Sequence, residues 1–579
     1  MSDIQIRTQR IDHLGIVAGI CKQIDLIGQI DQQVGDSGRK VSVGSAIQAM
    51  VLNGLGFVNR PLYLTPEFYA NKPIELLIGP GIVAEDLNDD CLGRALDRVV
   101  KVGVTEIYYQ LAAHALAVMG IANRFAHAET SAFSVEGAYE TAEENAIKIT
   151  YGYSKDHRPD LKQAMLGLIC ANTLSIPVWL YGILVNDIYL NGIFGSQRQR
   201  SRFQRPIVHA ESVLEALDGN RADKKGLVSM VSAYISHFAS EEETPYIIAD
   251  GAVYSAENLK KLSSVKWVTR VPATLSKVQK LLTTISLKDM TAGTDGYFYY
   301  EQQVSYAGSL QRWLLVLSQK GLKRDLLQLE RSIAKERDEV KRALKKLERE
   351  QFSCEADALL ASQRVQKPLK YHRLTPMAKS TTRYAKRGRP SAHAQANVSW
   401  KVHADLEVDE NRVAECREPL GKFIVATNQL AIEKLPALEL LSVYKDQNRS
   451  VERGFRFLKD PWFFASSFFL KKPSRIMGLL MVMGISLLVY SLAEHLLRSQ
   501  LSAQDQTIPN QLGKPTKTPT MRRVFQMFDG IDLFITQRGD MRFTQVLNLQ
   551  PIHHQILALL GPTIQQFYNS ISYSHSWVT

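Results

Sequence analysis

Apolar side chains recur at helical spacing through the first part of the chain. The stretch VSVGSAIQAMVLNGLGF, residues 41–57, alternates small and apolar residues with a helical period. Asn88 is placed to cap a helix that begins near Asp89. The pattern predicts an all-helical N-terminal domain over residues 1–118.

The period changes to two at Arg124, where RFAHAETSAFSVEG is typical of a strand. One face of this strand would carry Phe125, His127, Glu129, Ser131 and Phe133. The stretches IKITYGYS (147–154) and QAMLGLICA (163–171) predict two further strands.

A short buried strand then delivers a carboxylate. After a predicted helix from Asp223 to Phe238, the stretch YIIAD has four apolar-rich residues and ends in Asp250. The helix SAENLKKL and the strand KWVTRVP follow. Strand, strand, strand, helix, strand, helix, strand is an α/β order that fits a ribonuclease-H-like core over residues 119–275.

Residues 276–430 predict a mixed β and helical insertion. They begin with β-like sequence, and then Leu322 to Leu347 has apolar residues at heptad spacing, broken once by Glu336. This indicates a helical hairpin arm or a short coiled coil. A basic stretch, 367–393, and more β-like sequence complete the insertion.

The run from Ile476 to Ala493 carries no charge and stops at Glu494. It is long enough for a short membrane span, but a buried core helix explains it more simply and is the interpretation that we adopt. It closes the last part of the core, residues 431–500. Residues 501–579 predict a linker followed by a small helical module that includes LNLQPIHHQILALLG.

Charge and cysteine content narrow the class of protein. The net charge is +12, which favours a polyanionic partner. The five cysteines are scattered without a CxxC pair, which excludes a zinc cluster or a disulfide framework and fits a reducing cytosol. The N-terminus has no apolar signal core.

The segment 444–469, YKDQNRSVERGFRFLKDPWFFASSFF, holds the candidate chemistry. It reads as a helix in which one acid, Glu452, stands among cations at helical spacing: Arg449, Arg453, Arg456 and Lys459. Cations suit a phosphate backbone, and a lone carboxylate suits a metal ion bound to phosphate. The alternative is a surface helix laced with ion pairs.

This segment resembles the signature of DDE transposases in the IS-four group of bacterial insertion sequences. The shared pattern is Tyr, Arg and Glu, then six residues and Lys, and VERGFRFLKDP is close to one long branch with an N-terminal helical domain. The sequences YGYSKDHRPDLKQ, LGLIC and YIIADGAVYSAENL extend the resemblance to roughly residues 10–497. Counting back from Glu452, the family's Arg falls at Asn448, one residue before Arg449.

The resemblance implies a site with three acids and two Mg²⁺ ions, for which Mn²⁺ can substitute. Two-metal phosphoryl transfer needs carboxylates that hold cations about 3.5–4 Å apart. Asp250 matches the second acid and Glu452 the third. The residues expected to contact DNA are Tyr444, Arg449, Arg453, Arg456 and Lys459. The alternative for Asp250 is a turn or helix-capping aspartate.

Two features depart from the family pattern. Counting back from Phe133 places Glu129, rather than an aspartate, in the first acid position, and Glu136 is the nearest other acid. Catalytic geometry tolerates about 0.5 Å of displacement, so the longer side chain predicts reduced activity. Residues 181–213 also form an insertion that includes GSQRQRSRFQR, which is either tolerated at a surface turn or a mark of decay.

The stretch KRGRP resembles an AT-hook core, in which Arg enters the narrow minor groove of A·T-rich DNA. It adds Lys386, Arg387 and Arg389 to the predicted DNA contacts. A solvated basic linker is the alternative.

The resemblance implies a transposase that binds the terminal inverted repeats of its element and target DNA. We expect a homodimer in the synaptic complex, no membrane association, and a location in the bacterial cytoplasm at the nucleoid. A catalytically inactive DNA-binding relative and a stand-alone nuclease of the same fold are the alternatives.

Overall fold

The computed structural model describes residues 4–35, 38–58, 61–135, 149, 151, 160–171, 175–182, 219–240, 243–384, 396–460, 470, 472–538, 541–569 and 571–574. The chain divides into two compact units. The first comprises Met1–Thr269 and Leu441–Thr579, and the second comprises Arg270–Leu440.

Helices dominate the N-terminal part of the first unit, as predicted. They are α1 (Leu14–Gln23), α2 (Leu26–Val34), α3 (Val43–Leu55), α4 (Thr65–Tyr69), α5 (Ile74–Leu77), α6 (Asp89–Val102) and α7 (Val104–Val118). The predicted cap is confirmed, since the Asn88 side chain accepts the N–H of Cys91 at 3.0 Å. The exception is a strand, β1 (Gln5–Arg10), at the start of the chain.

The long helix α16 (Pro473–Ala503) forms the centre of this unit. It packs against α1, α3, α6, α7, α18 (Pro551–Leu560) and the strand β4 (Ile176–Gly182). Its length and composition would allow it to cross a membrane, but 94% of its apolar stretch is buried inside the protein. The buried-core interpretation therefore explains its apolar run.

A mixed sheet carries the candidate site. Its strands in the first unit are β2 (Phe125–Val135), β3 (Lys162–Ala171), β4, β5 (Tyr246–Ala249) and β6 (Trp267–Val271), and their order is β4-β3-β2-β5-β6. The pairs β2–β3 and β3–β4 are antiparallel, whereas β5 runs parallel to β2 and β6 parallel to β5.

The helices α8 (Gly219–Ile235) and α9 (Ala256–Lys261) connect these strands in the predicted alternation. Most of the predicted strand at 147–154 lies outside the described residues, and the third strand before α8 is β4.

The second unit contains a small sheet and an elongated arm. The sheet has the order β12-β9-β8-β7, from β7 (Thr291–Ala292), β8 (Tyr297–Tyr306), β9 (Ser309–Ser318) and β12 (Lys422–Thr427), with α10 (Ser276–Thr284) nearby. The arm consists of α11 (Gln319–Leu347), α12 (Glu355–Gln366), β10 (His372–Tyr384), β11 (Ala396–Val408) and α13 (Glu410–Arg417). The chain returns through α14 (Ala437–Lys445) and α15 (Val451–Leu458).

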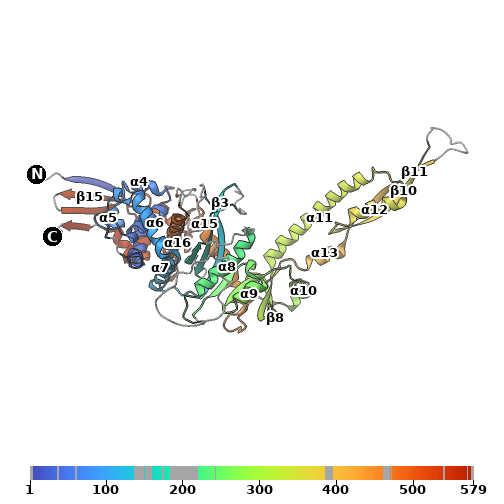
Figure 1. Ribbon diagram of the computed structural model, residues 1–579, viewed down its shortest axis with the longest axis horizontal. Coiled ribbons are helices and arrows are strands. Elements are labelled where there is room, and N and C mark those ends of the chain that lie inside the picture. The colour runs from blue at the N-terminus through green and yellow to red at the C-terminus, as the bar shows by residue number, and fades with distance from the viewer. Residues whose placement is uncertain are drawn as a thin grey trace, which may run out of the picture. The chain divides into compact units, whose positions relative to one another are not determined.

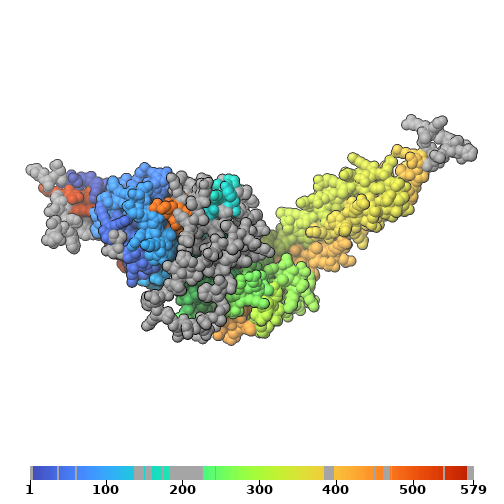
Figure 2. All heavy atoms as spheres, in the orientation of Figure 1, coloured from blue at the N-terminus to red at the C-terminus, as the bar shows by residue number. Residues whose placement is uncertain are grey.

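In the arm the long helix α11 and the shorter helix α12 pack on a two-stranded ribbon, rather than forming a coiled coil (Figure 1). Apolar residues of α11, α12, β11 and the segment before β10 form its core: Val340, Leu344, Leu347, Ala358, Leu369 and Val402. In Figure 2 the part of the chain coloured from yellow-green to orange shows these elements as a continuous packed rod.

Glu336 interrupts the heptad pattern because its carboxylate binds the start of the ribbon. Its carboxylate accepts the backbone N–H groups of Lys370, Tyr371 and His372 and contacts His372 Nδ1 at 2.9 Å. The acid therefore fixes the start of the ribbon to the middle of α11.

The C-terminal segment differs from the helical module that its sequence was expected to form. It contains β13 (Ile508–Pro509), β14 (Pro515–Thr516), α17 (Met521–Met527), β15 (Asp532–Arg538), β16 (Met541–Leu547), α18, α19 (Pro562–Gln565) and β17 (Ile571–Ser574). The expected helix near LNLQP is present as α18, but β15, β16 and β17 form a four-stranded antiparallel sheet completed by β1. The alternation of buried Leu533 and Ile535 with half-buried neighbours is the strand signal that the helical prediction overlooked.

Candidate active site

The predicted strand that delivers Asp250 is confirmed. All four residues of β5 are buried, and Asp250 follows directly and is exposed. Its Oδ1 accepts the N–H of Ala252 at 2.9 Å and so caps a 3₁₀ turn, Gly251–Val253. Asp250 is thus a capping residue in this structure, and its carboxylate is also accessible at the end of a central strand.

Glu129 lies level with Asp250 on the neighbouring strand. The parallel pairing of β2 and β5 matches His127 with Ile248, and two positions later come Glu129 on β2 and Asp250 directly after β5. Neighbouring strands are about 4.8 Å apart, and residues at matching levels of a parallel pair project to the same face. The two acids therefore stand side by side at one face of the sheet.

The helix α15 packs over that same face. A Cβ built on Gly454 would lie 3.0 Å from Leu168 Cδ2 and 3.8 Å from Cys170 Sγ. Leu168 is the cross-strand neighbour of Glu129 in the antiparallel pair β2–β3. A side chain at this position would press on Leu168, so glycine favours this close approach, which brings the Glu452 helix onto the strands beside Glu129.

The buried thiol of Cys170, on β3, is a second contact between α15 and the sheet. Ser450, directly before α15, hydrogen-bonds to this thiol. Burial raises the pKa of Cys170, and the nearby charge of Glu129 raises it further. Both the start of α15 and the first candidate acid are therefore near one buried side chain.

The outward side of α15 carries the acid that we predicted to be catalytic. Val451, Phe455 and Leu458 are buried, whereas Glu452 and Arg456 are exposed. Lys459 follows the helix, and its Nζ lies 5.6 Å from the ring centroid of Phe133. Because Phe133 and Glu129 have the same parity on β2, Lys459 lies over the face that carries Glu129.

The side chain of Arg453 does not project to the same side as the exposed residues Glu452 and Arg456. Its guanidinium forms an ion pair with Glu494 on α16, and Arg498 approaches the same carboxylate at 3.0 Å. Glu494 is buried and also accepts the N–H of Met521 at the start of α17. Arg453 thus holds α15 against the core, although it was predicted to contact DNA.

Sequence reasoning missed the role of Glu494. The available signal was an acid directly after the uncharged run of residues 476–493, since a charge there needs a buried partner.

His127 is a buried group beside the acids. Burial lowers its pKa to about 4. Within the described part of the chain, neither ring nitrogen has a hydrogen-bond partner.

Several predicted contacts can be located only in part. Tyr444 is half-buried on α14, and Arg449 ends the 3₁₀ turn Asp446–Arg449. The basic residues Lys386, Arg387 and Arg389, the acid Glu136 and most of the insertion 181–213 lie outside the described residues.

The carboxylates offer the oxygen ligands that Mg²⁺ prefers. Across the described ranges, however, no group of three or more His, Cys, Asp and Glu side chains lies close enough to hold a metal ion. The structure therefore brings Glu129, Asp250 and the Glu452 helix to one face of the sheet without joining them in one coordination sphere.

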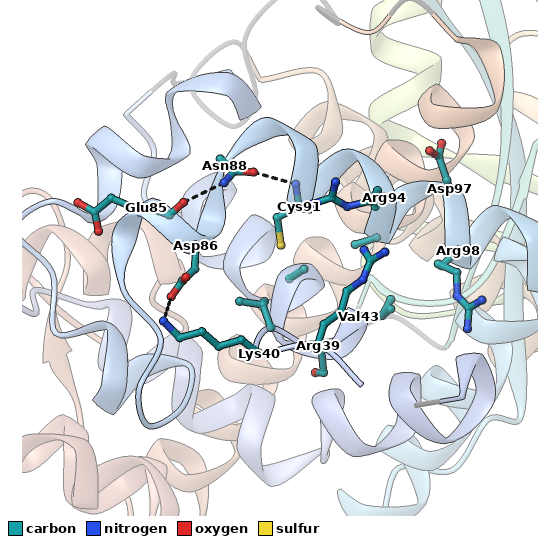
Figure 3. A pocket seen from close by; sticks show the side chains of 14 residues that line it. Arg39, Lys40, Val43, Glu85, Asp86, Asn88, Cys91, Arg94, Asp97 and Arg98 are labelled. Carbon is teal, nitrogen blue, oxygen red and sulfur yellow. Dashed lines mark hydrogen bonds and ion pairs between the residues drawn. The ribbon is translucent and has the colours of Figure 1, made fainter. Parts of the chain in front are cut away.

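A separate pocket lies in the N-terminal helices, with about 570 Å³ of space for water (Figure 3). Its walls come from α3, α6 and the chain before them, and include Arg39, Arg94 and Arg98. Lys40 pairs with Asp86 at its edge. None of the predicted site residues lines it.

Comparisons with known proteins find a similarity to one family in this N-terminal region. Residues 6–113 match a family described as "Domain of unknown function (DUF4277)". No curated protein matches the chain. Among solved structures, the chain is similar to a piggyBac transposase in a synaptic complex with hairpin DNA, at 8% identity and a TM-score of 0.36. That likeness covers 90% of this chain and 82% of the other.

Proposed function

We propose that this protein is a DDE transposase of a bacterial insertion sequence, which cleaves and joins DNA by metal-dependent phosphoryl transfer. The observation that carries the proposal is the placement of the acids. Glu129 and Asp250 stand level on two parallel strands, and the Glu452 helix packs over the face that carries Glu129. Two carboxylates about 120 positions apart in sequence thereby stand level, and the helix that carries Glu452, about 200 positions further on, packs over the same face.

The topology supports a ribonuclease-H-like core. Three antiparallel strands followed by two parallel strands, in the order β4-β3-β2-β5-β6, match the core that the family resemblance implies. The second unit, which follows Asp250 and precedes Glu452 in sequence, corresponds to the insertion expected between the second and third acids.

In this proposal the three carboxylates would hold Mg²⁺, with Mn²⁺ as a substitute. The bound ions would supply activation of the attacking oxygen and stabilisation of the leaving oxygen. The chain's own cations would orient DNA: Arg456 is exposed one turn after Glu452, and Lys459 lies over β2. Two protomers, each holding one element end, would form the synaptic complex.

The test is cleavage of a supercoiled plasmid that carries the repeats flanking the gene, in Mg²⁺ and in Mn²⁺. The proteins are the wild type, Glu129→Asp, Asp250→Ala and Glu452→Ala. We expect the wild type to nick at the repeat ends, Glu129→Asp to be faster, and both alanine variants to be inactive. Glu439→Ala, which removes a carboxylate from α14, is the control and should cleave normally.

A second candidate is a DNA-binding relative without catalysis, favoured by the glutamate at position 129. Cleavage by Glu129→Asp but not by the wild type would establish that function. If no protein cuts although all bind the repeats, the assignment of the acids is wrong. Cutting without preference for repeat ends would indicate a stand-alone nuclease.

A further inference from the structure

The ribbon of the arm has two faces of different character. Its strands β10 and β11 pair over thirteen positions, from His372 with Val408 to Tyr384 with Ala396. Even-numbered residues face the arm core, where Leu374, Ala378, Trp400, Ala404 and Leu406 pack against the buried cluster. Odd-numbered residues therefore form the opposite face, which is turned to solvent.

Charge is segregated along this outer face. The half nearest α11 contains two acids, since Arg373 pairs with Glu407 at 2.9 Å and Thr375 stands opposite Asp405. The other half consists of three cross-strand pairs: Lys379 with Lys401, Thr381 with Ser399, and Arg383 with Asn397. We call these six residues the basic ribbon face; it holds three cations and no acid.

The cations of the basic ribbon face are available for a ligand. Lys379 and Arg383 are exposed and Lys401 is half-exposed. Over the described ranges, none of these three side chains forms an ion pair. Two lysines directly opposite each other on one sheet face repel, so this arrangement costs stability unless an anion lies between or above them.

We propose that the basic ribbon face docks in a groove of duplex DNA. The proposal rests on the proposed function for its choice of DNA as the polyanion, but it assigns the contact to residues outside the active site. Two strands about 4.8 Å apart fit within a major groove about 12 Å wide, which admits a two-stranded ribbon. Lys379, Lys401 and Arg383 would contact phosphates, and the short side chains of Thr381, Ser399 and Asn397 would let the backbone approach the groove floor.

The experiment measures binding of the full-length protein to a labelled 30-base-pair duplex across a KCl series. The test variant is Lys379→Ala/Arg383→Ala/Lys401→Ala. The matched control, Lys341→Ala/Lys345→Ala/Arg364→Ala, removes three exposed cations from the helices of the same arm. Thermal unfolding of each variant shows whether the arm remains folded.

We expect the ribbon variant to lose at least about tenfold in affinity at 0.1 M salt. The slope of log K against log salt concentration should become shallower by about 2.7, as for three lost phosphate contacts. The control should change affinity by less than about twofold. Equal losses in both variants, or wild-type binding by the folded ribbon variant, would overturn the proposal.

The same series separates this inference from the proposed function. Glu452→Ala should bind with the wild-type salt slope, because it leaves the ribbon unchanged. A wild type that never cleaves but binds through the ribbon refutes only the proposed function. A cleaving enzyme whose ribbon variant binds normally refutes only the ribbon proposal, and a wild type that does not bind duplex DNA refutes both.

Discussion

Arg453, on the candidate catalytic helix α15, forms an ion pair with Glu494, which is buried on α16. This carboxylate also meets Arg498 and the N-terminus of α17, so a single buried acid joins α15, α16 and α17. Breaking one partner of a buried charge cluster is costly because the remaining charges stay desolvated. The orientation of Glu452 therefore depends on a residue forty-two positions further along the chain.

The first prediction compares the two arginines that share Glu494. Arg453→Ala and Arg498→Ala should each lower the free energy of unfolding by about 1–3 kcal/mol, because each removes one hydrogen-bonded charge partner. Only Arg453 belongs to α15, so Arg453→Ala should reduce plasmid cleavage at least tenfold more than Arg498→Ala does. DNA affinity should be unchanged in Arg453→Ala, and a drop in affinity with normal cleavage of bound DNA would instead favour a direct DNA contact.

The second prediction concerns the close approach of α15 to the sheet. In Gly454→Ala the new methyl group would meet Leu168 and Leu487, at 3.0 and 3.2 Å. Such overpacking costs about 1–3 kcal/mol and should shift α15 and its acid away from Glu129. We expect slower cleavage by the folded protein.

Gly478→Ala is the control for this change. The new methyl group would be as crowded as the one at position 454, since it would lie 3.1 Å from Leu96. Gly478, however, lies on α16, at the contact between α16 and α6. Comparable destabilisation with normal cleavage is expected. If both variants cleave alike, the contact at Gly454 does not position the site.

The third prediction is a loss of arm stability in acid. Partial burial opposes ionisation of Glu336, but the hydrogen bonds from His372, Lys370 and Tyr371 outweigh it and lower its pKa below 4.5. A carboxyl with a depressed pKa stabilises the folded state above the unfolded value, and the contribution is lost as pH falls through the folded value. Hydrogen exchange in β10 should therefore accelerate below about pH 4.5 in the wild type.

Glu336→Gln should show fast exchange in β10 already at pH 7 and little further change in acid. Glu339→Gln, on the exposed side of α11, should behave as the wild type. Acid sensitivity that persists in Glu336→Gln would place its origin elsewhere.

The fourth prediction concerns His127 and a higher pH range. Its pKa of about 4 lies below the ordinary value of 6.5, so the unfolded chain binds the proton more tightly. The stabilisation is complete above about pH 6.5 and is lost as pH falls toward 4. His127→Leu should flatten the pH dependence of the unfolding midpoint between these values, whereas an unchanged slope would show that His127 is not its source.

The fifth prediction tests the packing around the site with thiol chemistry. Cys170 is fully buried and burial raises its pKa, whereas Cys354 is exposed at the start of α12. A thiol reagent at pH 8 should label Cys354 rapidly and Cys170 only on unfolding. Rapid labelling of Cys170 in the native protein would contradict the packing of α15 on β3.

Local pattern was sufficient for much of this protein. The buried strand before Asp250, the cap at Asn88, the amphipathic α15 and the burial of residues 476–493 could all be predicted, because each depends on side chains within a few turns or one strand. The acids Glu129, Asp250 and Glu452 were assigned from the family resemblance, and their catalytic role stays a prediction. What sequence could not supply was their mutual placement.

Tertiary structure decided the features that join distant segments. The strands β15 and β16 form a local hairpin whose alternation was overlooked, whereas the pairing of β15 with β1, from the opposite end of the chain, lies outside any local window. The sequence predicted Arg453 as a surface cation, but in the structure it pairs with Glu494. Glu336 interrupted a heptad pattern in the sequence, but in the structure its carboxylate accepts three backbone N–H groups. The role of a charged side chain or a strand edge depends on the group that forms its ion pair or hydrogen bonds. In this protein those partner groups are distant in sequence.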